Sequence, residues 1–336
     1  MPLKNSKILL LFFLISYLGI SQNKEFKDTV NSTQNEYVHF YKNRLITRIY
    51  YVNTSNSLTV NHENSGKSLD FNANKQSRIG ASVAFRKLAI SYSYAPEFIS
   101  TNKNNESSKL FNLNLRGFYK RRWMQTIKVY NEKGFYAKNT VQSIYLPNTE
   151  SFKIGGSTSY IFNDNFSYRA LASQNERQLK NAGSFIPGVT YYYSNYHLNT
   201  EGKLDENNLK RKYNSYDLLL SPSYFYNYVP NKNILISGGS TLGLGVNYST
   251  SENNNITTLI TELGFSGTVT YDLTNLYIGS HFNYLILKHN TNRSLYVKDD
   301  IPYFQFFVGY RFKASKKLVK TAEDFNEKII PIIPNI

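Results

Sequence analysis

The chain has 336 residues, with 39 basic residues against 23 acidic ones and a formal net charge of +16. It contains no cysteine, which excludes disulfide scaffolds, thiolate metal sites and cysteine catalysis. A mean hydropathy of −0.44 excludes a helical membrane protein. It does not exclude a membrane β-barrel, whose lipid-facing and polar side chains alternate and average to a polar composition.

Residues 1–21 have the pattern of a secretory signal peptide. Lys4 and Lys7 precede an apolar run over residues 8–20, and Gly19 and Ser21 are small residues at the cleavage position. The run is shorter than the ~18–20 residues that a membrane-spanning helix needs, so we expect cleavage rather than a retained anchor. Residues 22–44 are polar without a clear period, and we expect a periplasmic N-terminal segment there.

The charge of the exported chain bears on its partners. Cleavage of the signal peptide removes Lys4 and Lys7, which leaves 37 basic and 23 acidic residues and a net charge of +14. Export argues against a nucleic-acid partner. Outer-membrane lipid and lipopolysaccharide are the expected counter-charges, and solvated lysine-rich loops are the alternative.

Between residues 45 and 312, apolar residues recur at every second position. The clearest segments are 111–116, 217–228, 234–248, 259–271 and 276–286. In the last of these, Leu276, Ile278 and Phe282 oppose His281 and Asn283, as in a strand with one apolar and one polar face. Several segments exceed the ~9–11 residues of a tilted membrane strand, whereas strands of soluble sheets average about 5–6.

The fold class follows from these strands. A sheet in lipid must pair every backbone group, so it has to close on itself. We therefore predict an all-β protein, a closed antiparallel transmembrane β-barrel of about 12–14 strands over residues 45–312. A soluble periplasmic β-protein is the alternative.

The connections fall into two classes, as in outer-membrane barrels, which have short periplasmic turns and long external loops. Tight turns are expected at 86–87, 163–165, 230–232 and 272–275, and long loops at 96–108, 198–212, 250–255 and 289–299. When strands are counted with this rule from the N-terminus and from the C-terminus, the two counts differ by one strand across 165–198. One strand there is missed or wrongly assigned.

The last strand is the most specific feature of the sequence. Val308, Tyr310 and Phe312 share a face with Phe304 and Phe306. An aromatic-ended alternating strand is similar to the signal that the outer-membrane assembly machinery recognises, so this machinery is an expected partner. Residues 313–336 are expected to form a periplasmic C-terminal tail. Its end, residues 329–334, cannot be a regular helix because it contains two prolines.

At this point the chain resembles the Bacteroidota family catalogued as domain of unknown function 4421, which comprises predicted outer-membrane barrels. The residues that carry the resemblance are 134–136 (GFY), 160–163 (YIFN), 166–170 (FSYRA), 178–185 (QLKNAGSF) and 308–312 (VGYRF). The resemblance covers about residues 30–320. Asn181 departs from the Ser expected there. The resemblance implies the outer membrane and the barrel fold, and no activity.

The segment 165–185 is both the hallmark of that resemblance and the place where the strand counts disagree. Arg169, Gln178 and Lys180, with Gly183, could form an inward-folded constriction or a packed network. The alternative is that Gly183 provides a tight bend between two strands.

Charged side chains on the polar faces are the candidate lumen-lining residues. They are Arg116, Lys128, Arg169, Asp217, Glu262 and Arg311, with His281 beside them. Four bases against two acids would favour anions in a lined pore. Internal salt bridges that fill the lumen are the alternative.

A lipid-modifying barrel enzyme is the competing class of function. Its best candidate constellation is His281 with Asn283 on one strand face and Ser266 from the neighbouring strand. Such an arrangement is common by chance in a serine-rich lumen, so we expect no catalytic residues. We also expect no metal site and no cofactor. The sequence thus predicts an outer-membrane barrel that acts as a narrow channel or as a structural or accessory envelope protein.

Overall fold

The computed structural model describes twelve ranges of the chain: residues 36–54, 57–62, 67–73, 76–86, 88–96, 98–99, 108–138, 143–172, 175–199, 210–251, 255–292 and 295–329. The expected signal peptide at 1–21 and most of the segment 22–44 lie outside them, as does the end of the expected tail.

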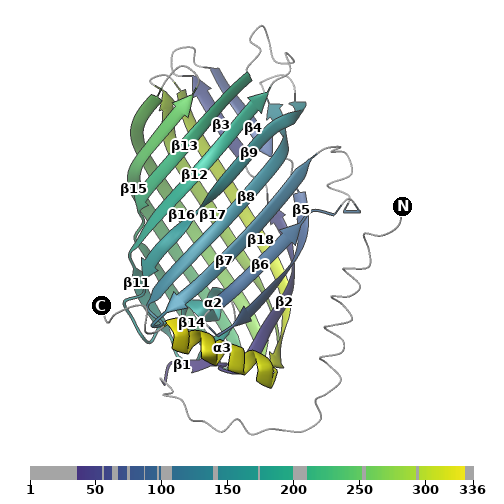
Figure 1. Ribbon diagram of the computed structural model, residues 1–336, viewed down its shortest axis with the longest axis vertical. Coiled ribbons are helices and arrows are strands. Elements are labelled where there is room, and N and C mark those ends of the chain that lie inside the picture. The colour runs from purple at the N-terminus through teal and green to yellow at the C-terminus, as the bar shows by residue number, and fades with distance from the viewer. Residues whose placement is uncertain are drawn as a thin grey trace. The chain divides into compact units, whose positions relative to one another are not determined.

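Sixteen strands of the described ranges form one antiparallel sheet (Figure 1). They are β2 (Arg44–Thr54), β3 (Ser57–His62), β4 (Lys67–Ala73), β5 (Gln76–Phe85), β6 (Leu88–Tyr94), β7 (Lys109–Tyr119), β8 (Trp123–Lys138), β9 (Ser143–Tyr160), β11 (Ala182–Ile186), β12 (Gly188–Asn199), β13 (Lys210–Leu220), β14 (Ser223–Asn231), β15 (Ile234–Ser251), β16 (Asn255–Leu273), β17 (Leu276–Asn292) and β18 (Leu295–Lys313). The last strand, β18, pairs with β2 and β3, so the pairings run in a ring.

We call each crossing of the wall from one end of the ring to the other a pass. Four passes are each made of two consecutive strands: β2 with β3, β4 with β5, β11 with β12, and β13 with β14. Both β13 and β14 pair with β15 in one continuous register, and a proline, Pro222, separates them. Pro187 separates β11 from β12 in the same way. Because proline cannot donate a ladder hydrogen bond, each of these breaks interrupts the pairing without turning the chain. The described strands therefore make a ring of twelve passes, the lower end of the expected range.

The two ends of the ring differ. At one end, which we call the turn end, short turns join β5 to β6, β7 to β8, β14 to β15 and β16 to β17. The expected long loops at 250–255 and 289–299 are wrong, because β15 and β16 are separated only by residues 252–254 and β17 and β18 by residues 293–294. Residues 200–209 and most of 96–108 lie outside the described ranges.

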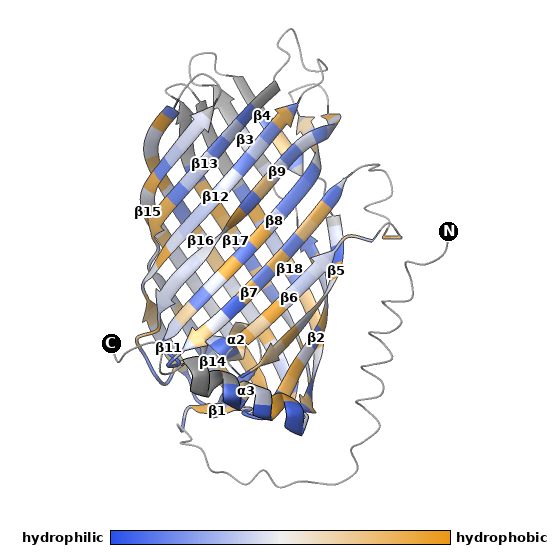
Figure 2. Ribbon diagram, viewed as in Figure 1, coloured by the Kyte–Doolittle hydropathy of each residue, from blue (hydrophilic) through white to orange (hydrophobic). Residues whose placement is uncertain are grey.

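The predicted alternation of faces is confirmed. On β18, Phe304, Phe306 and Val308 are exposed on the outer face of the ring, whereas Gln305 and Arg311 are buried on the inner one. The other strands follow the same rule, because the large apolar residues that alternate along them are exposed. Figure 2 shows the alternation of hydrophilic and hydrophobic residues along the strands.

One segment leaves the ring at the turn end. Residues 161–172 and 175–181, here called the inserted segment, contain the short helix α2 (Tyr168–Ala172) and the strand β10 (Glu176–Gln178). Strand β10 pairs with β1 (Val38–Phe40) in a separate two-stranded sheet. The turn expected at 163–165 therefore leads into this segment and not into a wall strand, and this explains why the two strand counts differ by one.

A C-terminal helix, α3 (Lys316–Ile329), follows the ring, in a tail for which no helix was expected. Its first turn is capped by Ser315, whose hydroxyl oxygen accepts a hydrogen bond from the Leu318 amide at 3.3 Å. Glu323 pairs with Arg86 at 2.9 Å, which ties the helix to the turn after β5. Neither this nor any other described helix is long and apolar enough to cross a membrane.

Candidate functional site

The interior of the ring holds a cavity of about 270 Å³. Its walls are formed by residues of β2, β5 to β9, β11, β12 and β14 to β18, many of them Ser, Thr or Asn. Helix α2 forms the floor, because Tyr168, Leu171 and Ala172 line the cavity from the turn end. The floor is anchored in an apolar cluster in which Leu171 packs with Phe118, Met124, Ile186 and Phe225 of the wall.

Four basic side chains line the cavity, and all lie on the wall from β2 to β8. We call them the basic strip: Arg48 on β2, Arg78 on β5, Arg116 on β7 and Lys128 on β8. The carboxylates among the lining residues are Glu132 and Glu262. The described lining thus has a net positive charge, and two of the predicted lumen-lining bases, Arg116 and Lys128, belong to it.

The basic strip has few internal partners. Arg48 donates from Nε to the Ser82 hydroxyl at 3.1 Å, and the Arg116 guanidinium lies 5.5 Å from the centre of the Tyr168 ring. The Nε atoms of Arg78 and Arg116 are buried without a hydrogen-bond partner. Within the described residues, no carboxylate forms an ion pair with any of the four.

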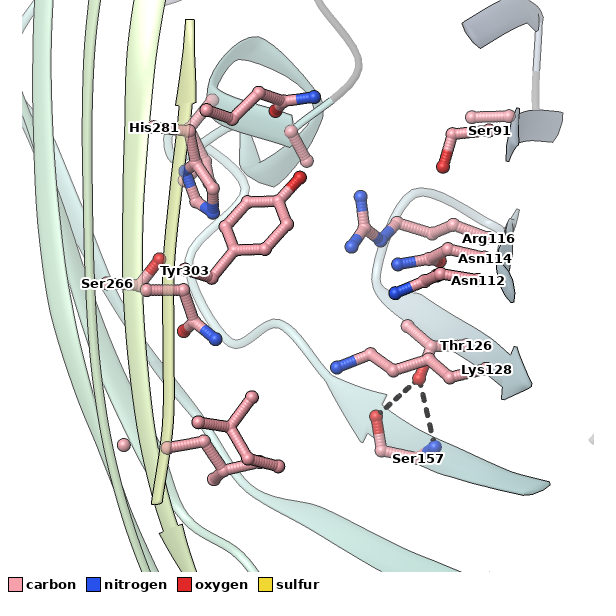
Figure 3. A pocket seen from close by; sticks show the side chains of 18 of the residues that line it. Ser91, Asn112, Asn114, Arg116, Thr126, Lys128, Ser157, Ser266, His281 and Tyr303 are labelled. Atoms are coloured by element: carbon pink, nitrogen blue, oxygen red, sulfur yellow. Dashed lines mark hydrogen bonds between the residues drawn. The ribbon is translucent and has the colours of Figure 1, made fainter. Parts of the chain in front are cut away.

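The opposite wall carries the residues of the catalytic alternative. Nδ1 of His281 lies 2.7 Å from the Thr268 hydroxyl, which is its cross-strand neighbour, while Ser266 is paired in register with Asn283 (Figure 3). Glu262 accepts a hydrogen bond from Ser221 at 3.0 Å. The histidine is thus hydrogen-bonded to Thr268, and the expected serine lies opposite the asparagine.

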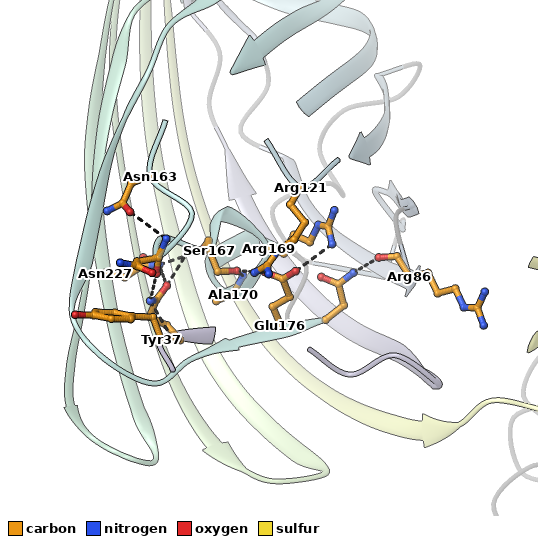
Figure 4. Close-up of polar contacts among 12 residues, drawn as sticks. Tyr37, Arg86, Arg121, Asn163, Ser167, Arg169, Ala170, Glu176 and Asn227 are labelled. Atoms are coloured by element: carbon orange, nitrogen blue, oxygen red, sulfur yellow. Dashed lines mark hydrogen bonds and ion pairs between the residues drawn. The ribbon is translucent and has the colours of Figure 1, made fainter. Parts of the chain in front are cut away.

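The inserted segment is held by a buried ion pair. Nη1 of Arg169 lies 3.0 Å from Oε1 of Glu176, and both side chains are at least nine-tenths buried. The Ser167 hydroxyl donates to the other carboxylate oxygen of Glu176 at 2.5 Å, and Arg121 approaches it to 3.9 Å (Figure 4). The Arg169 guanidinium also covers the Phe118 ring at 4.3 Å. Arg169, predicted to line the lumen, therefore fastens α2 instead.

The predicted hallmark residue Gln178 connects two parts of the inserted segment with each other, with Tyr37 near the N-terminus and with the wall. Its Oε1 accepts hydrogen bonds from the Ser167 amide and from Nδ2 of Asn227, each at 2.9 Å. Its Nε2 donates to the carbonyls of Asn165 at 2.6 Å and Tyr37 at 3.2 Å. This is the packed network that the sequence offered as one alternative.

The other hallmark residues lie outside this network. Lys180 is at the surface, paired with Glu36 and near the Tyr37 ring. Gly183 does not make a bend: it lies within β11 opposite Tyr226. A Cβ there would come within 2.5 Å of the Tyr224 hydroxyl, so the aromatic side chains beside it explain the glycine.

The remaining charged candidates are paired inside the ring. Arg311 makes two bonds to the Asp272 carboxylate, at 3.0 and 2.7 Å, between the rings of Tyr41 and Tyr277. Asp217 is buried and bonded to Ser215 and Asn247. Arg311 supports the alternative of internal salt bridges, whereas Asp217 is held by neutral hydrogen-bond donors, and neither residue lines the cavity.

Sequence reasoning missed Arg48, Arg78 and Glu132. Arg48 and Arg78 lie where the outer face of the strand also carries polar residues, as with Thr47 and Ser77, so alternation alone does not distinguish the faces. Glu132 precedes the bulge at Gly134, where the register of β8 shifts. No group of three or more His, Asp or Glu side chains in the described ranges could hold a metal ion.

Comparison with solved structures gives outer-membrane β-barrels at low similarity. An outer membrane channel from Pseudomonas putida F1 has 8% identity and a TM-score of 0.39, over 84% of this chain and 100% of that one. The outer membrane protease OmpT from Escherichia coli has 10% identity and a TM-score of 0.31, over 82% and 99%. The Pseudomonas putida toluene transporter TodX has 5% identity and a TM-score of 0.31, over 80% and 89%.

No curated protein matches the sequence. The family model described as domain of unknown function (DUF4421) matches residues 27–312, which include every strand of the ring up to Phe312. The chain therefore belongs to the family of domain of unknown function 4421.

Proposed function

We propose that the protein is a closed β-barrel of the outer membrane that acts as a narrow, anion-preferring channel, shut at its turn end by the inserted segment. The observation that carries the proposal is the separation of the two faces of the ring. The outer face is apolar and aromatic, whereas the inner one is polar with an excess of bases.

The outer face fits lipid better than water. On β17 alone, Leu276, Ile278 and Phe282 are each more than a third exposed. Comparable residues follow on every neighbouring pass, and contiguous apolar surface of this extent is rare on soluble monomers. This supports the membrane over the soluble alternative.

The height of the apolar surface also fits a bilayer. On β17 it extends from Leu276 to Ile286 and is followed by the exposed Lys288. At ~3.4 Å per residue and a tilt of ~45°, these positions span about 26 Å, close to the ~25 Å band of outer-membrane barrels. On other passes, the outer face changes from apolar to polar residues at Asn53, Asn131 and Glu150. The strands extend beyond this change at the end of the ring opposite the turn end, which we call the loop end.

Aromatic residues flank this band, as in the girdles of membrane barrels. At the turn end, Trp123, Tyr160 and Phe162 contact one another with ring centres 5.0 and 5.2 Å apart. At the upper limit, Tyr193, Tyr216 and Tyr248 form a second row. Outer-membrane lipid and lipopolysaccharide are the partners proposed for these rows, and the assembly machinery for β18.

Two measurements test the proposal. The membrane fraction should give a band whose gel migration changes on heating, and an unchanged band in a soluble extract would refute the barrel. In planar bilayers under a salt gradient, the reversal potential of the current should lie closer to the equilibrium potential of the anion than to that of the cation. R116Q/K128Q should weaken this preference, because it removes two of the lining cations.

The inserted segment supports a second candidate, a structural or accessory barrel without conductance. Absence of current from the wild type and from a variant with a loosened inserted segment would favour it. We propose no catalytic role, since the hydrogen bond of His281 is to Thr268 and not to Ser266.

A further inference from the structure

Two members of the basic strip, Arg48 and Lys128, are the ends of one row of register partners across five neighbouring strands. The row runs from Arg48 through Ser82, Ser91 and Asn114 to Lys128, each the register partner of the next. Arg116 is two residues from Asn114 on the same strand and so has its side chain on the same face. The row thus places cations at both ends of a series of small hydroxyl and amide donors.

Among the described residues, no carboxylate forms an ion pair with a member of the basic strip. Arg78 is 2% exposed, lines the cavity and has a buried Nε without a hydrogen-bond partner. The Nε of Arg116 is buried and unpartnered too. A buried unpaired charge costs several kcal/mol or more, so the interior is incomplete without an anion.

The lining also has suitable neutral donors. Asn112, Asn114 and Ser91 lie beside Arg116 on the same wall, and Lys128 extends into the same space (Figure 3). Tyr303 and His281 face them from the opposite wall. Guanidinium forks match the planar edges of oxyanions, and ammonium and hydroxyl groups add point contacts.

We propose that the basic strip is a binding site for a small phosphate-type oxyanion, held by Arg116 and Lys128 with Arg48 and Arg78 at its border. The site deepens the proposed channel function and rests on it for access to the ligand. The cavity of about 270 Å³ lies just below the ~300–1,000 Å³ of typical small-molecule pockets, which limits the part of the ligand inside the cavity to a phosphate group or a small phosphate ester.

Calorimetry on the full chain in detergent tests the site, with inorganic phosphate as the probe. Phosphate should bind to the wild type, and R116Q/K128Q should bind it at least about tenfold more weakly, since charged hydrogen bonds are lost. The control K317Q/K320Q removes the same charge from exposed positions of α3 and should stay within about twofold. Equal phosphate binding by R116Q/K128Q and the wild type would overturn the proposal.

A second arm identifies the source of the phosphate group. Dihexanoyl phosphatidate carries the same group on a lipid, and tighter binding of it than of inorganic phosphate would assign the site to lipid headgroups. Tighter binding of inorganic phosphate would assign it to free solutes. Absence of binding for both would refute the site.

The test of the binding site can fail independently of the test of the channel. Binding without conductance in any variant would refute the channel and retain the site, whereas conductance without binding would do the reverse. Unchanged heat-dependent migration of R116Q/K128Q shows that the variant is folded.

Discussion

Replacement of Glu176 by Gln should open the turn end of the ring. Glu176 is the carboxylate that holds Arg169 at 3.0 Å and Ser167 at 2.5 Å, and it is 4% exposed. The amide of E176Q keeps the shape of the side chain and removes its charge. Arg169, 5% exposed, is then left as a buried cation without its counter-charge.

The magnitude follows from the burial of the pair. Breaking one partner of a buried ion pair costs ~3–5 kcal/mol, and each ~1.4 kcal/mol is a factor of ten in an equilibrium. Because α2 has five residues, it has little stability of its own and depends on these contacts. The fraction of molecules with a displaced inserted segment should rise by about a hundredfold or more.

Two assays measure this rise. Single-channel recording should show a higher open probability for E176Q, and amide hydrogen exchange should accelerate over residues 161–181 while β15 to β18 stay protected. The control is K180Q, whose pair with Glu36 is at the surface and worth at most ~1 kcal/mol. Unchanged exchange in E176Q would refute the assignment of Glu176 as the fastener, and accelerated exchange of the whole ring would refute its local effect.

Three further predictions concern the ring and its turns. In β15, Gly245→Ala should lower the urea midpoint, because a Cβ there would lie 2.0 Å from a backbone carbonyl oxygen, whereas Gly238→Ala, with its nearest atom at 3.9 Å, should not. Arg311→Gln should cost ~3–5 kcal/mol of unfolding free energy through its unpaired buried aspartate, while R116Q should be neutral or stabilising; a similar loss in both would contradict the pairing argument. Hydrogen bonds from Arg122 lower the pKa of Asp164 below its ordinary 3.8, so its contribution is present above that value and is lost as the pH falls through the lower, folded-state pKa. The protection factors of the amides over 122–124 and 163–165, which are the intrinsic exchange rates at each pH divided by the observed rates, should therefore be constant from pH 7 to about 4 and fall at lower pH. A fall that starts near pH 6 would exclude this carboxylate as the cause.

The outer face could be predicted from the sequence because its apolar residues recur with a regular period of two. Phe304, Phe306 and Val308 alternate with inward residues over the whole end of β18, and their exposure follows that alternation. No partner outside the strand has to be known, since every second residue contacts the same medium. The same argument accounts for the polar assignment of His281 and Glu262.

The interior was less predictable because its partners come from distant parts of the chain. The roles of Arg169 and Arg311 depend on Glu176 and Asp272, and each carboxylate lies on a different element from its arginine. The inserted segment has no period that distinguishes it from a wall strand. By contrast, Pro222 lies inside the alternating segment 217–228, and β13 and β14 form one pass across it, as the alternation indicates.

The C-terminal helix could have been predicted from local signals. Ser315 is an N-cap residue followed by helix-forming Lys and Leu residues, and the prolines that argue against helix come only after Ile329.

The pairing of the charges divides the interior into two parts with different roles. At the turn end, Arg311 and Arg169 each meet a buried carboxylate, and such pairs hold a structure in place without attracting a ligand. In the cavity, Arg78 and Arg116 keep buried Nε atoms without partners, although carboxylates on the opposite wall could have been placed beside them. An unpaired cation lowers the stability of the fold, so its presence is explained by a partner that arrives from outside. Because that partner reaches the cavity only past the loop end or past a displaced inserted segment, the fastening of α2 and the occupancy of the basic strip should be thermodynamically linked.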